Sequence, residues 1–438
     1  MAIRNAVRER SILVGLEWKT RGARARAGAI GVEESLEELA ELAASAGATV
    51  SARVLQTLPA PEAATLIGRG KVEELAAAVK SGEVDVVIFD QDLSPTQQRN
   101  LEKALQTKVI GRTQLILDIF ASRARTREGR LQVELAQLSY LLPRLSGHGV
   151  EMSRLGGGIG TRGPGETKLE TDRRRIAKRI KKIEDELEGV RAGRGLHRQR
   201  RSAVPLATLA LAGYTNAGKS TLFNRLTQSG VLTDARMFAT LDPTVRPLVL
   251  PSRRRVLMSD TVGFIRNLPT TLVKAFRATL EEVNEAALVL HVVDVSTPAA
   301  AEHTAHVSKV LAEIGAAEIP QILVLNKIDR AVTVEGQADA ESLHRRLLSE
   351  TGGQAGTRAV SLSALTGAGI ERLLAEIDDV LQMDPIVRET FRLRSGDGAR
   401  LALLHEFGRV IETRYNGEDC EVEAEVPESL KRRLESPG

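Results

Sequence analysis

The chain has 438 residues, of which 42% are hydrophobic and 3% aromatic, and at a typical ~150 residues per domain its length predicts about three domains. Its single cysteine, Cys420, excludes an internal disulfide and a cysteine-cluster metal site, and it favours a reducing compartment. The N-terminal residues lack the apolar run of a signal peptide and no stretch approaches the ~20 apolar residues of a membrane span, so we expect a soluble cytoplasmic protein.

Residues 1–115 alternate between strand and helix patterns. We expect strands over 11–18, 49–55 and 84–90, and helices over 32–47, 68–82 and 94–106. The last helix has Ser94 as its N-cap and Pro95 in its first turn. This alternation predicts an N-terminal α/β domain with a parallel sheet.

Residues 116–200 contain two long helical patterns. The first covers 131–145 and is interrupted near Pro143, whereas the second covers 170–195 and is rich in charge. We expect an antiparallel helical hairpin, with the glycine-rich segment 154–172 as an exposed loop between the helices. A long α/β domain over 201–384 and a small α+β appendage over 385–438 complete the predicted α/β fold.

The segment GYTNAGKS (213–220) matches the phosphate-loop pattern G-x-x-x-x-G-K-[ST] and lies between an apolar strand and a helix. Gly213 and Gly218 allow successive N–H groups to face phosphate oxygens. Lys219 is expected between the β- and γ-phosphates, and the Ser220 hydroxyl on Mg²⁺. This strand–loop–helix context makes a chance glycine turn a poor explanation.

Two further segments suit the sensing of magnesium and of the γ-phosphate. MFATLDPT (237–244) offers Thr240 as the better Mg²⁺ ligand, with Thr244 as its rival. Asp260 ends an apolar strand and is expected to reach Mg²⁺ through a water, while the N–H of Gly263 faces the γ-phosphate.

The segment NKID (326–329) follows the apolar run ILVL and predicts a guanine-selective site. Asp329 can accept hydrogen bonds from N1–H and the 2-amino group, a donor pair that adenine lacks. Asn326 can bridge to the phosphate loop and the stem of Lys327 can cover the base. In SLSAL (361–365), the N–H groups near Ser363 and Ala364 can bind the guanine O6.

The expected nucleotide site comprises the phosphate loop, the two sensing segments and the two base-reading segments. Its residues are Gly213, Tyr214, Thr215, Asn216, Ala217, Gly218, Lys219, Ser220, Thr221, Phe238, Ala239, Thr240, Leu241, Asp242, Asp260, Thr261, Val262, Gly263, Asn326, Lys327, Ile328, Asp329, Ser361, Leu362, Ser363 and Ala364. No residue is assigned firmly as catalytic, and the candidates are Lys219, Thr240, Gly263 and Asn216.

Taken together, these motifs resemble a translation-factor-class GTPase. IGRGKVEEL (67–75), DLSPTQQRNLE (92–102), the segment 111–138 and GGGIGTRGPGETKLETDRRRI (156–176) resemble the HflX family more specifically, and the likeness covers residues 10–385. The resemblance implies a GTPase that binds GTP and GDP with Mg²⁺ and associates with the large (50S) ribosomal subunit. It also implies that the protein splits ribosomes under stress. The base-reading segment departs from the usual Ser-Ala-Lys, since Leu365 replaces the lysine.

Phe264 stands where many GTPases place a glutamine that orients the attacking water. The resemblance implies that a hydrophobic residue is normal here, and a phenyl ring cannot orient water by hydrogen bonding. We therefore expect slow intrinsic hydrolysis that needs help with positioning and charge. One candidate is a K⁺ ion held by Asn216, although Asn216 also suits a tight turn; the other is a partner that orders the loop around Phe264.

Basic residues suggest an RNA partner. Those on the second long helix are partly balanced by acids, so a solvated face is an equal alternative. The glycine-rich loop and the linker after the helix are the stronger phosphate-binding candidates. No aromatic residues lie among them, so base stacking is not indicated. The candidates are Arg154, Arg162, Lys168, Arg191, Arg194, Arg198, Arg200 and Arg201.

We expect a GTPase, monomeric off the ribosome and partly ribosome-associated, that acts in ribosome splitting, rescue or recycling. Two alternatives stay open: a ribosome-assembly GTPase without splitting activity, and an RNA-binding module with a structural nucleotide. The glycine-rich segment IGRGK (67–71) is a weak indication of ATP use by the N-terminal domain. It is weak because the segment is too short for a phosphate loop.

Overall fold

The computed structural model describes residues 9–18, 31–145, 164–202, 206–228, 237–238, 244–266, 283–330, 358–381, 386–394, 397–416 and 419–435. The chain divides into two compact units. Unit 1 comprises Met1–Glu188, Thr233–Asp242 and Gly263–Arg277, and unit 2 comprises Gly189–Leu232, Pro243–Val262 and Ala278–Gly438. Unit 1 therefore contains two short segments that lie far along the sequence from the rest of it.

Unit 1 contains a four-stranded parallel sheet in the order β2-β1-β3-β4, as the strand–helix alternation predicts. Its strands are β1 (Arg10–Trp18), β2 (Thr49–Leu58), β3 (Val86–Phe89) and β4 (Lys108–Gly111). Strand β3 is buried throughout and β1 is buried except at its two ends, as the apolar residues of these strands indicate.

Four helices accompany this sheet: α1 (Val32–Ser45), α2 (Arg69–Gly82), α3 (Pro95–Leu105) and α4 (Arg112–Arg123). Ser94 and Gln97 form the predicted cap of α3, because each side chain bonds to the backbone N–H of the other residue. Leu75, Phe89 and Leu101 belong to a core that joins α2 and α3 to the sheet.

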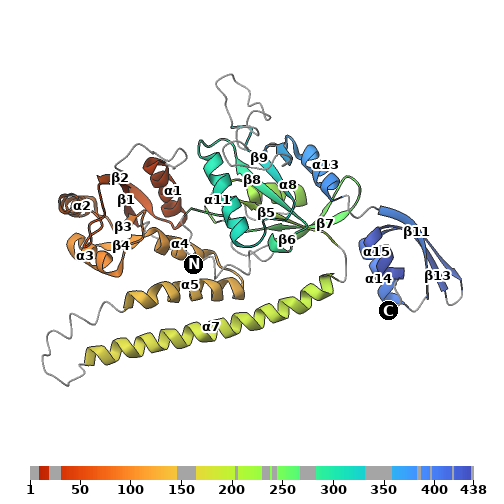
Figure 1. The fold of residues 1–438 in the computed structure, drawn as a ribbon, viewed down its shortest axis with the longest axis horizontal. Coiled ribbons are helices and arrows are strands. Elements are labelled where there is room, and N and C mark those ends of the chain that lie inside the picture. The colour runs from red at the N-terminus through yellow and green to blue at the C-terminus, as the bar shows by residue number, and fades with distance from the viewer. Residues whose placement is uncertain are drawn as a thin grey trace, which may run out of the picture. The chain divides into compact units, whose positions relative to one another are not determined.

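Helices α5 (Arg127–Leu145) and α7 (Pro164–Ser202) form the predicted long hairpin (Figure 1). Leu131 of α5 packs against Ile183 and Leu187 of α7. Arg179 makes two hydrogen bonds of 2.7 Å to the carboxylate of Glu134. These contacts hold the two helices side by side.

Two expectations for this region were wrong. Helix α5 continues through Pro143 to Leu145, because a proline in the last turn removes only its own bond to the carbonyl four residues earlier and only two residues follow it. Residues 164–172, expected in a loop, form the first turns of α7, where Pro164 is suited to a helix start. Residues 154–163 lie outside the described part of the chain.

Unit 2 contains a six-stranded sheet in the order β10-β9-β8-β5-β7-β6. The strands are β5 (Thr208–Gly213), β6 (Thr244–Val249), β7 (Arg255–Asp260), β8 (Leu288–Asp294), β9 (Gln321–Asn326) and β10 (Arg358–Ser361). Only β6 is antiparallel to its neighbour. The parallel order brings the ends of β5, β7, β8 and β9 to one edge, where ligands bind in open α/β sheets.

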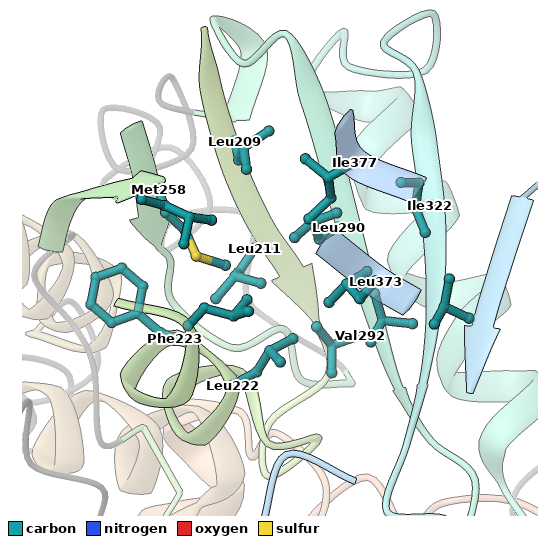
Figure 2. Packing of buried hydrophobic residues seen from close by; sticks show 14 of the residues in the cluster. Leu209, Leu211, Leu222, Phe223, Met258, Leu290, Val292, Ile322, Leu373 and Ile377 are labelled. Atoms are coloured by element: carbon teal, nitrogen blue, oxygen red, sulfur yellow. The ribbon is translucent and has the colours of Figure 1, made fainter. Parts of the chain in front are cut away.

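Helices α8 (Lys219–Thr227), α11 (Ala300–Glu313) and α13 (Ile370–Val380) belong to the same fold. Figure 2 shows Leu222 and Phe223 of α8 and Leu373 and Ile377 of α13 pointing toward the side chains of the central strands, including Leu290. This core fixes the starts of α8 and α13 relative to the strand ends.

The C-terminal part is a small α+β structure, as expected. Its antiparallel sheet has the order β11-β13-β12, with β11 (Ile386–Arg394), β12 (Arg409–Asn416) and β13 (Asp419–Pro427). Helices α14 (Gly398–Phe407) and α15 (Glu428–Glu435) share its core, which includes the buried Cys420. Within the described residues, no helix is long and apolar enough to cross a membrane.

Candidate functional site

The loop between β5 and α8 has the geometry that the phosphate-loop motif predicts. Gly213 has φ 153°, and a Cβ there would lie 2.3 Å from the carbonyl oxygen of Val292. Gly218 has φ 94°, and its Cβ would lie 2.3 Å from Nδ2 of Asn326. Both positions therefore require glycine for conformation and for space.

Lys219 is buried at the start of α8. Its Nζ donates to the carbonyl oxygens of Gly213 at 3.0 Å and Tyr214 at 2.7 Å. Burial lowers the pKa of Lys219 to about 8, although the nearby Asp260 carboxylate opposes this shift. The lysine is thus a hydrogen-bond donor held inside the loop by two neutral backbone acceptors.

Ser220 and Asp260 are brought together from two elements, α8 and the end of β7. The Ser220 hydroxyl donates to Oδ2 of Asp260 at 2.8 Å. These are hard oxygen donors, which suit Mg²⁺ completed by phosphates and water. Within the described residues no group of three His, Cys, Asp or Glu side chains can hold a metal.

Asn326 connects the phosphate loop to the second base-reading segment. Its Nδ2 donates to the carbonyl of Ala217 at 2.8 Å, and its Oδ1 accepts from the N–H of Ala364 at 2.9 Å. Because Asn326 is buried, both polar ends of its amide require these partners. The bridge from Asn326 to the phosphate loop, expected from the sequence, is therefore present. Asn326 also bonds to Ala364, a contact that the sequence motif did not predict.

Asp294, which sequence reasoning missed, holds Lys327 in place. Its Oδ2 lies 2.6 Å from Nζ of Lys327, and its Oδ1 accepts from the N–H and hydroxyl of Ser296 at 2.9 and 2.6 Å. Lys327 has a left-handed φ of 66°, which turns the chain sharply after β9. The available signal was an aspartate at the end of the buried run LVLHVVD.

Apart from Ser361, which ends β10, the remaining base-reading residues follow the ends of β9 and β10. Asp329 is exposed, whereas Leu362, Ser363 and Ala364 are buried. The N–H of Leu362 donates to the carbonyl of Leu325 at 2.8 Å, which holds the two strand ends in register. Ile328 and Ser361 lie at the same strand ends.

Tyr214 carries a contact that the motif does not predict. Its ring stacks on the imidazole of His303 in α11, with centroids 3.7 Å apart. Beneath the loop, His291 on β8 is buried, and burial followed by the nearby Lys219 charge lowers its pKa to about 4. Thr215 is buried, whereas Asn216 is exposed with φ 60°. This geometry is compatible with Asn216 as a K⁺ ligand and with Asn216 as a residue that suits a tight turn.

The sensing segments are described in part. Phe238 is buried in unit 1, but Ala239, Thr240, Leu241 and Asp242 lie outside the described residues. Thr244 begins strand β6 opposite Asp260. Thr261 is fixed by its hydroxyl, which donates to the carbonyl of Leu211 at 2.5 Å.

Gly263 and Phe264 belong to unit 1, and Phe264 is buried. Of the RNA-binding candidates, Arg154 and Arg162 lie outside the described part of the chain. The side chains of Lys168, Arg191, Arg194, Arg198, Arg200 and Arg201 lie outside it as well.

Family models match most of the chain. Residues 33–121 match a GTP-binding GTPase N-terminal model, and residues 123–201 match a GTP-binding GTPase middle region. Residues 208–327 match a 50S ribosome-binding GTPase model, and 274–383 an elongation factor Tu GTP-binding domain. The last two cover the segment in which the nucleotide motifs lie.

Curated relatives match over nearly their full length. The GTPase HflX of Caldanaerobacter subterraneus is 48% identical over 402 residues, covering 92% of this chain and 90% of the relative. That of Escherichia coli is 44% identical over 393 residues, covering 90% and 89%. A GTP-binding protein from Sulfolobus solfataricus, solved with GDP, is 24% identical with a TM-score of 0.46, covering 85% of this chain and 98% of that one. The chain belongs to the HflX family of GTPases, whose GTP-hydrolysing activity suits the phosphate loop and base-reading segments found here.

Proposed function

We propose that this GTPase uses its GTP/GDP cycle to bind the 50S ribosomal subunit and to split or rescue ribosomes under stress. The match of residues 208–327 to a 50S ribosome-binding GTPase model is the observation that carries the ribosomal part. The Asn326 bridge, which links the phosphate loop to the base-reading loop, supports nucleotide-dependent control of the site.

Within this proposal each residue of the pocket has a defined task. Lys219 binds the β- and γ-phosphates, and Asp329 selects guanine because it pairs with two donors that adenine lacks. Ser220 holds Mg²⁺, with Asp260 acting through a water and Thr240 as the further ligand. Bound Mg²⁺ would neutralise phosphate charge, which is the chemistry it supplies in phosphoryl transfer. The N–H of Gly263 senses the γ-phosphate.

Helix α7 offers a surface for ribosomal RNA. Arg174, Arg175 and Arg179 are paired with carboxylates. The other described cations of this stretch, Arg173, Lys178, Lys181 and Lys182, are exposed and have no carboxylate partner among the described residues. An RNA backbone would release counterions from such a surface, so binding should weaken steeply with salt.

The decisive experiment is sedimentation of intact 70S ribosomes with the full chain and a non-hydrolysable GTP analogue. We expect conversion to 50S and 30S peaks, with the protein in the 50S fractions. A Lys219→Ala variant should leave the 70S peak intact because it no longer holds the phosphates. Protein that moves with 50S subunits without splitting 70S would support the assembly alternative. RNA affinity that is equal with GTP, GDP or no nucleotide would support the RNA-binding module.

The cause of slow intrinsic turnover is tested by a second measurement. GTP hydrolysis is followed with and without 50S subunits, in K⁺ and in Na⁺. Ribosomal stimulation in both salts supports a partner that orders the Phe264 loop, whereas stimulation by K⁺ alone supports a cation held at Asn216. An Asp329→Asn variant should change the preference from guanine toward xanthine nucleotides.

We further propose a cytoplasmic protein that is monomeric off the ribosome.

A further inference from the structure

Unit 1 includes two segments of the GTPase sequence, Thr233–Asp242 and Gly263–Arg277. The first contains the proposed magnesium ligand Thr240, with Met237 and Phe238 as its described residues, and the second begins at Gly263. Their described residues contact α1 and α4 directly. The N-terminal part of the chain therefore holds the backbone on either side of the residues that sense the γ-phosphate.

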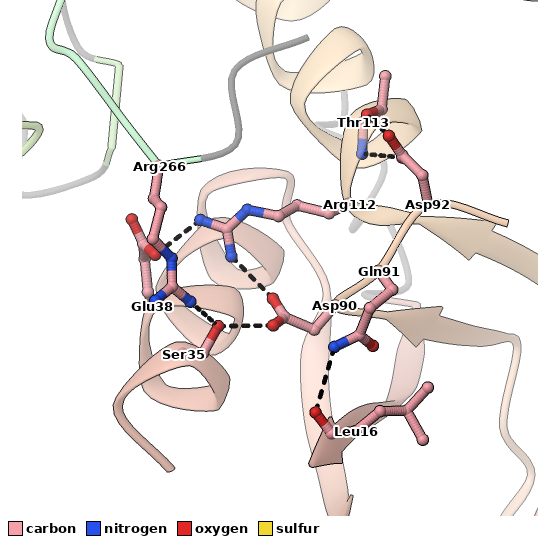
Figure 3. A network of polar contacts seen from close by, with 9 residues as sticks. All are labelled: Leu16, Ser35, Glu38, Asp90, Gln91, Asp92, Arg112, Thr113 and Arg266. Atoms are coloured by element: carbon pink, nitrogen blue, oxygen red, sulfur yellow. Dashed lines mark hydrogen bonds and ion pairs between the residues drawn. The ribbon is translucent and has the colours of Figure 1, made fainter. Parts of the chain in front are cut away.

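A buried polar cluster forms the contact with the second segment (Figure 3). Arg112, 2% exposed, donates to Oδ1 of Asp90 at 2.8 Å and to Oε2 of Glu38 at 2.6 Å. The Ser35 hydroxyl donates to Oδ2 of Asp90 at 2.5 Å and accepts a hydrogen bond from Arg266. Arg266 lies two residues after Phe264 and reaches the cluster by this bond.

The cluster has a charge that suits a second guanidinium. Asp90 and Glu38 are both largely buried, and Arg112 balances only one of these two carboxylates. Buried charges are costly unless paired, so the remaining negative charge favours a cation at this place. Asp90 and Arg112 follow the ends of β3 and β4. Ligands of open α/β sheets bind at this edge, and here the ligand is a side chain of the same protein.

The first segment is held by a different set of contacts. The N–H of Met237 donates to Oγ of Ser45, the last residue of α1, at 2.9 Å. The ring of Phe238 meets that of Phe120 in α4 edge to face, with centroids 4.5 Å apart. Phe238 has φ 58°, a strained conformation for a bulky residue, and such strain persists only where neighbouring contacts impose it.

We propose that Ser35 and Asp90 are positioning residues for GTP hydrolysis, because they anchor Arg266 and thereby fix the loop that begins at Gly263. This loop contains no glutamine, so its backbone must be held in place by contacts elsewhere. Anchoring at Arg266 lowers the entropy lost when Gly263 is ordered on the γ-phosphate. The inference rests on the GTPase activity and on the proposed contact of Gly263 with the γ-phosphate, and it is independent of any ribosomal role.

The test is single-turnover and steady-state GTP hydrolysis by the full-length protein without ribosomes. We compare wild type with Ser35→Ala, Arg266→Met and the double variant. We expect kcat to fall between about tenfold and a hundredfold in each, with KM and the affinity for GDP little changed. The double variant should be no slower than Arg266→Met, since both single changes remove the same hydrogen bond between Arg266 and Ser35. Arg266→Lys should recover part of the rate because it restores the charge.

Two matched controls separate positioning from a general loss of structure. Arg53→Met removes an exposed arginine of unit 1, and Ser81→Ala removes an exposed serine at the end of α2; both should hydrolyse GTP at the wild-type rate. Hydrogen exchange over residues 32–45 should rise in Arg266→Met, because the variant loses its contact with Ser35. Unchanged or faster turnover in Arg266→Met would overturn the proposal, and so would additive effects in the double variant.

Discussion

Asp294 holds Lys327 through an ion pair of 2.6 Å at the junction of β8 and β9. Both side chains are mostly buried, at 18% and 16% exposure, so solvent screens this pair less than it screens surface pairs. The second oxygen of Asp294 is held by Ser296. The aliphatic stem of Lys327 is therefore fixed in the position proposed to cover the guanine ring.

Replacing Asp294 by Asn should weaken the binding of GTP and GDP alike by roughly tenfold, or about 1.4 kcal/mol. The amide retains a contact with Ser296 but loses the attraction for Lys327. Calorimetry with both nucleotides measures the change. Asp379→Asn is the control, because Asp379 pairs with Arg358 at an exposed site away from the pocket. Equal affinities in Asp294→Asn and wild type would contradict the positioning of Lys327.

A methyl group at Gly218 should abolish nucleotide binding. The added Cβ would lie 2.3 Å from the amide nitrogen of Asn326 and would sit on a left-handed backbone. Gly218→Ala must therefore break the bridge between Ala217 and Ala364, and we expect at least a hundredfold loss of GTP affinity, which is about 2.7 kcal/mol. Gly70→Ala is the matched control, since no atom lies within 4 Å of its Cβ, and it should leave nucleotide affinity unchanged.

GTP affinity should fall as the pH rises through about 8. Burial lowers the pKa of Lys219 to about 8, so the ligand-free protein loses the proton there, while bound phosphates keep the lysine charged. Linkage then predicts up to a tenfold loss of affinity for each pH unit above that value. Titration with a non-hydrolysable GTP analogue from pH 7 to 9.5 measures it. A flat profile would show that Lys219 titrates well above this range.

His291 should make unfolding sensitive to acid. Burial lowers its pKa from 6.5 to about 4, so between these values the unfolded chain binds a proton that the folded protein does not. The stability from this group is complete above pH 6.5 and is lost as the pH falls toward 4, by about 3 kcal/mol in total. Its Nε2 has no hydrogen-bond partner in the described structure, so an apolar residue can replace it.

His291→Leu should consequently have a flatter dependence of the free energy of unfolding on pH than wild type. Denaturant unfolding at pH 7 and pH 5, followed by a probe in unit 2, compares the two proteins. If the free energy of unfolding falls by the same amount in His291→Leu and in wild type, groups other than His291 govern acid stability in this range.

Much of the architecture was predictable because it follows from local patterns. The strand–helix alternation of residues 10–111 gave the parallel sheet, and Ser94 gave the start of α3. The ends of α5 and α7 were harder, since helix ends depend on few contacts. Pro143 near the end of α5 shows how a local rule weakens where few hydrogen bonds remain to be broken.

The nucleotide motifs could be recognised from the sequence by itself. Each motif is a short run of residues that binds one part of the nucleotide through its own backbone or side chains. Contacts between distant segments were decided only by the tertiary structure, because partners such as Asp294 and Lys327, or Ser35 and Arg266, are 33 and 231 positions apart. No short pattern encodes such pairs. Packing of each sheet with its own helices selects them by bringing strand ends and helix starts together.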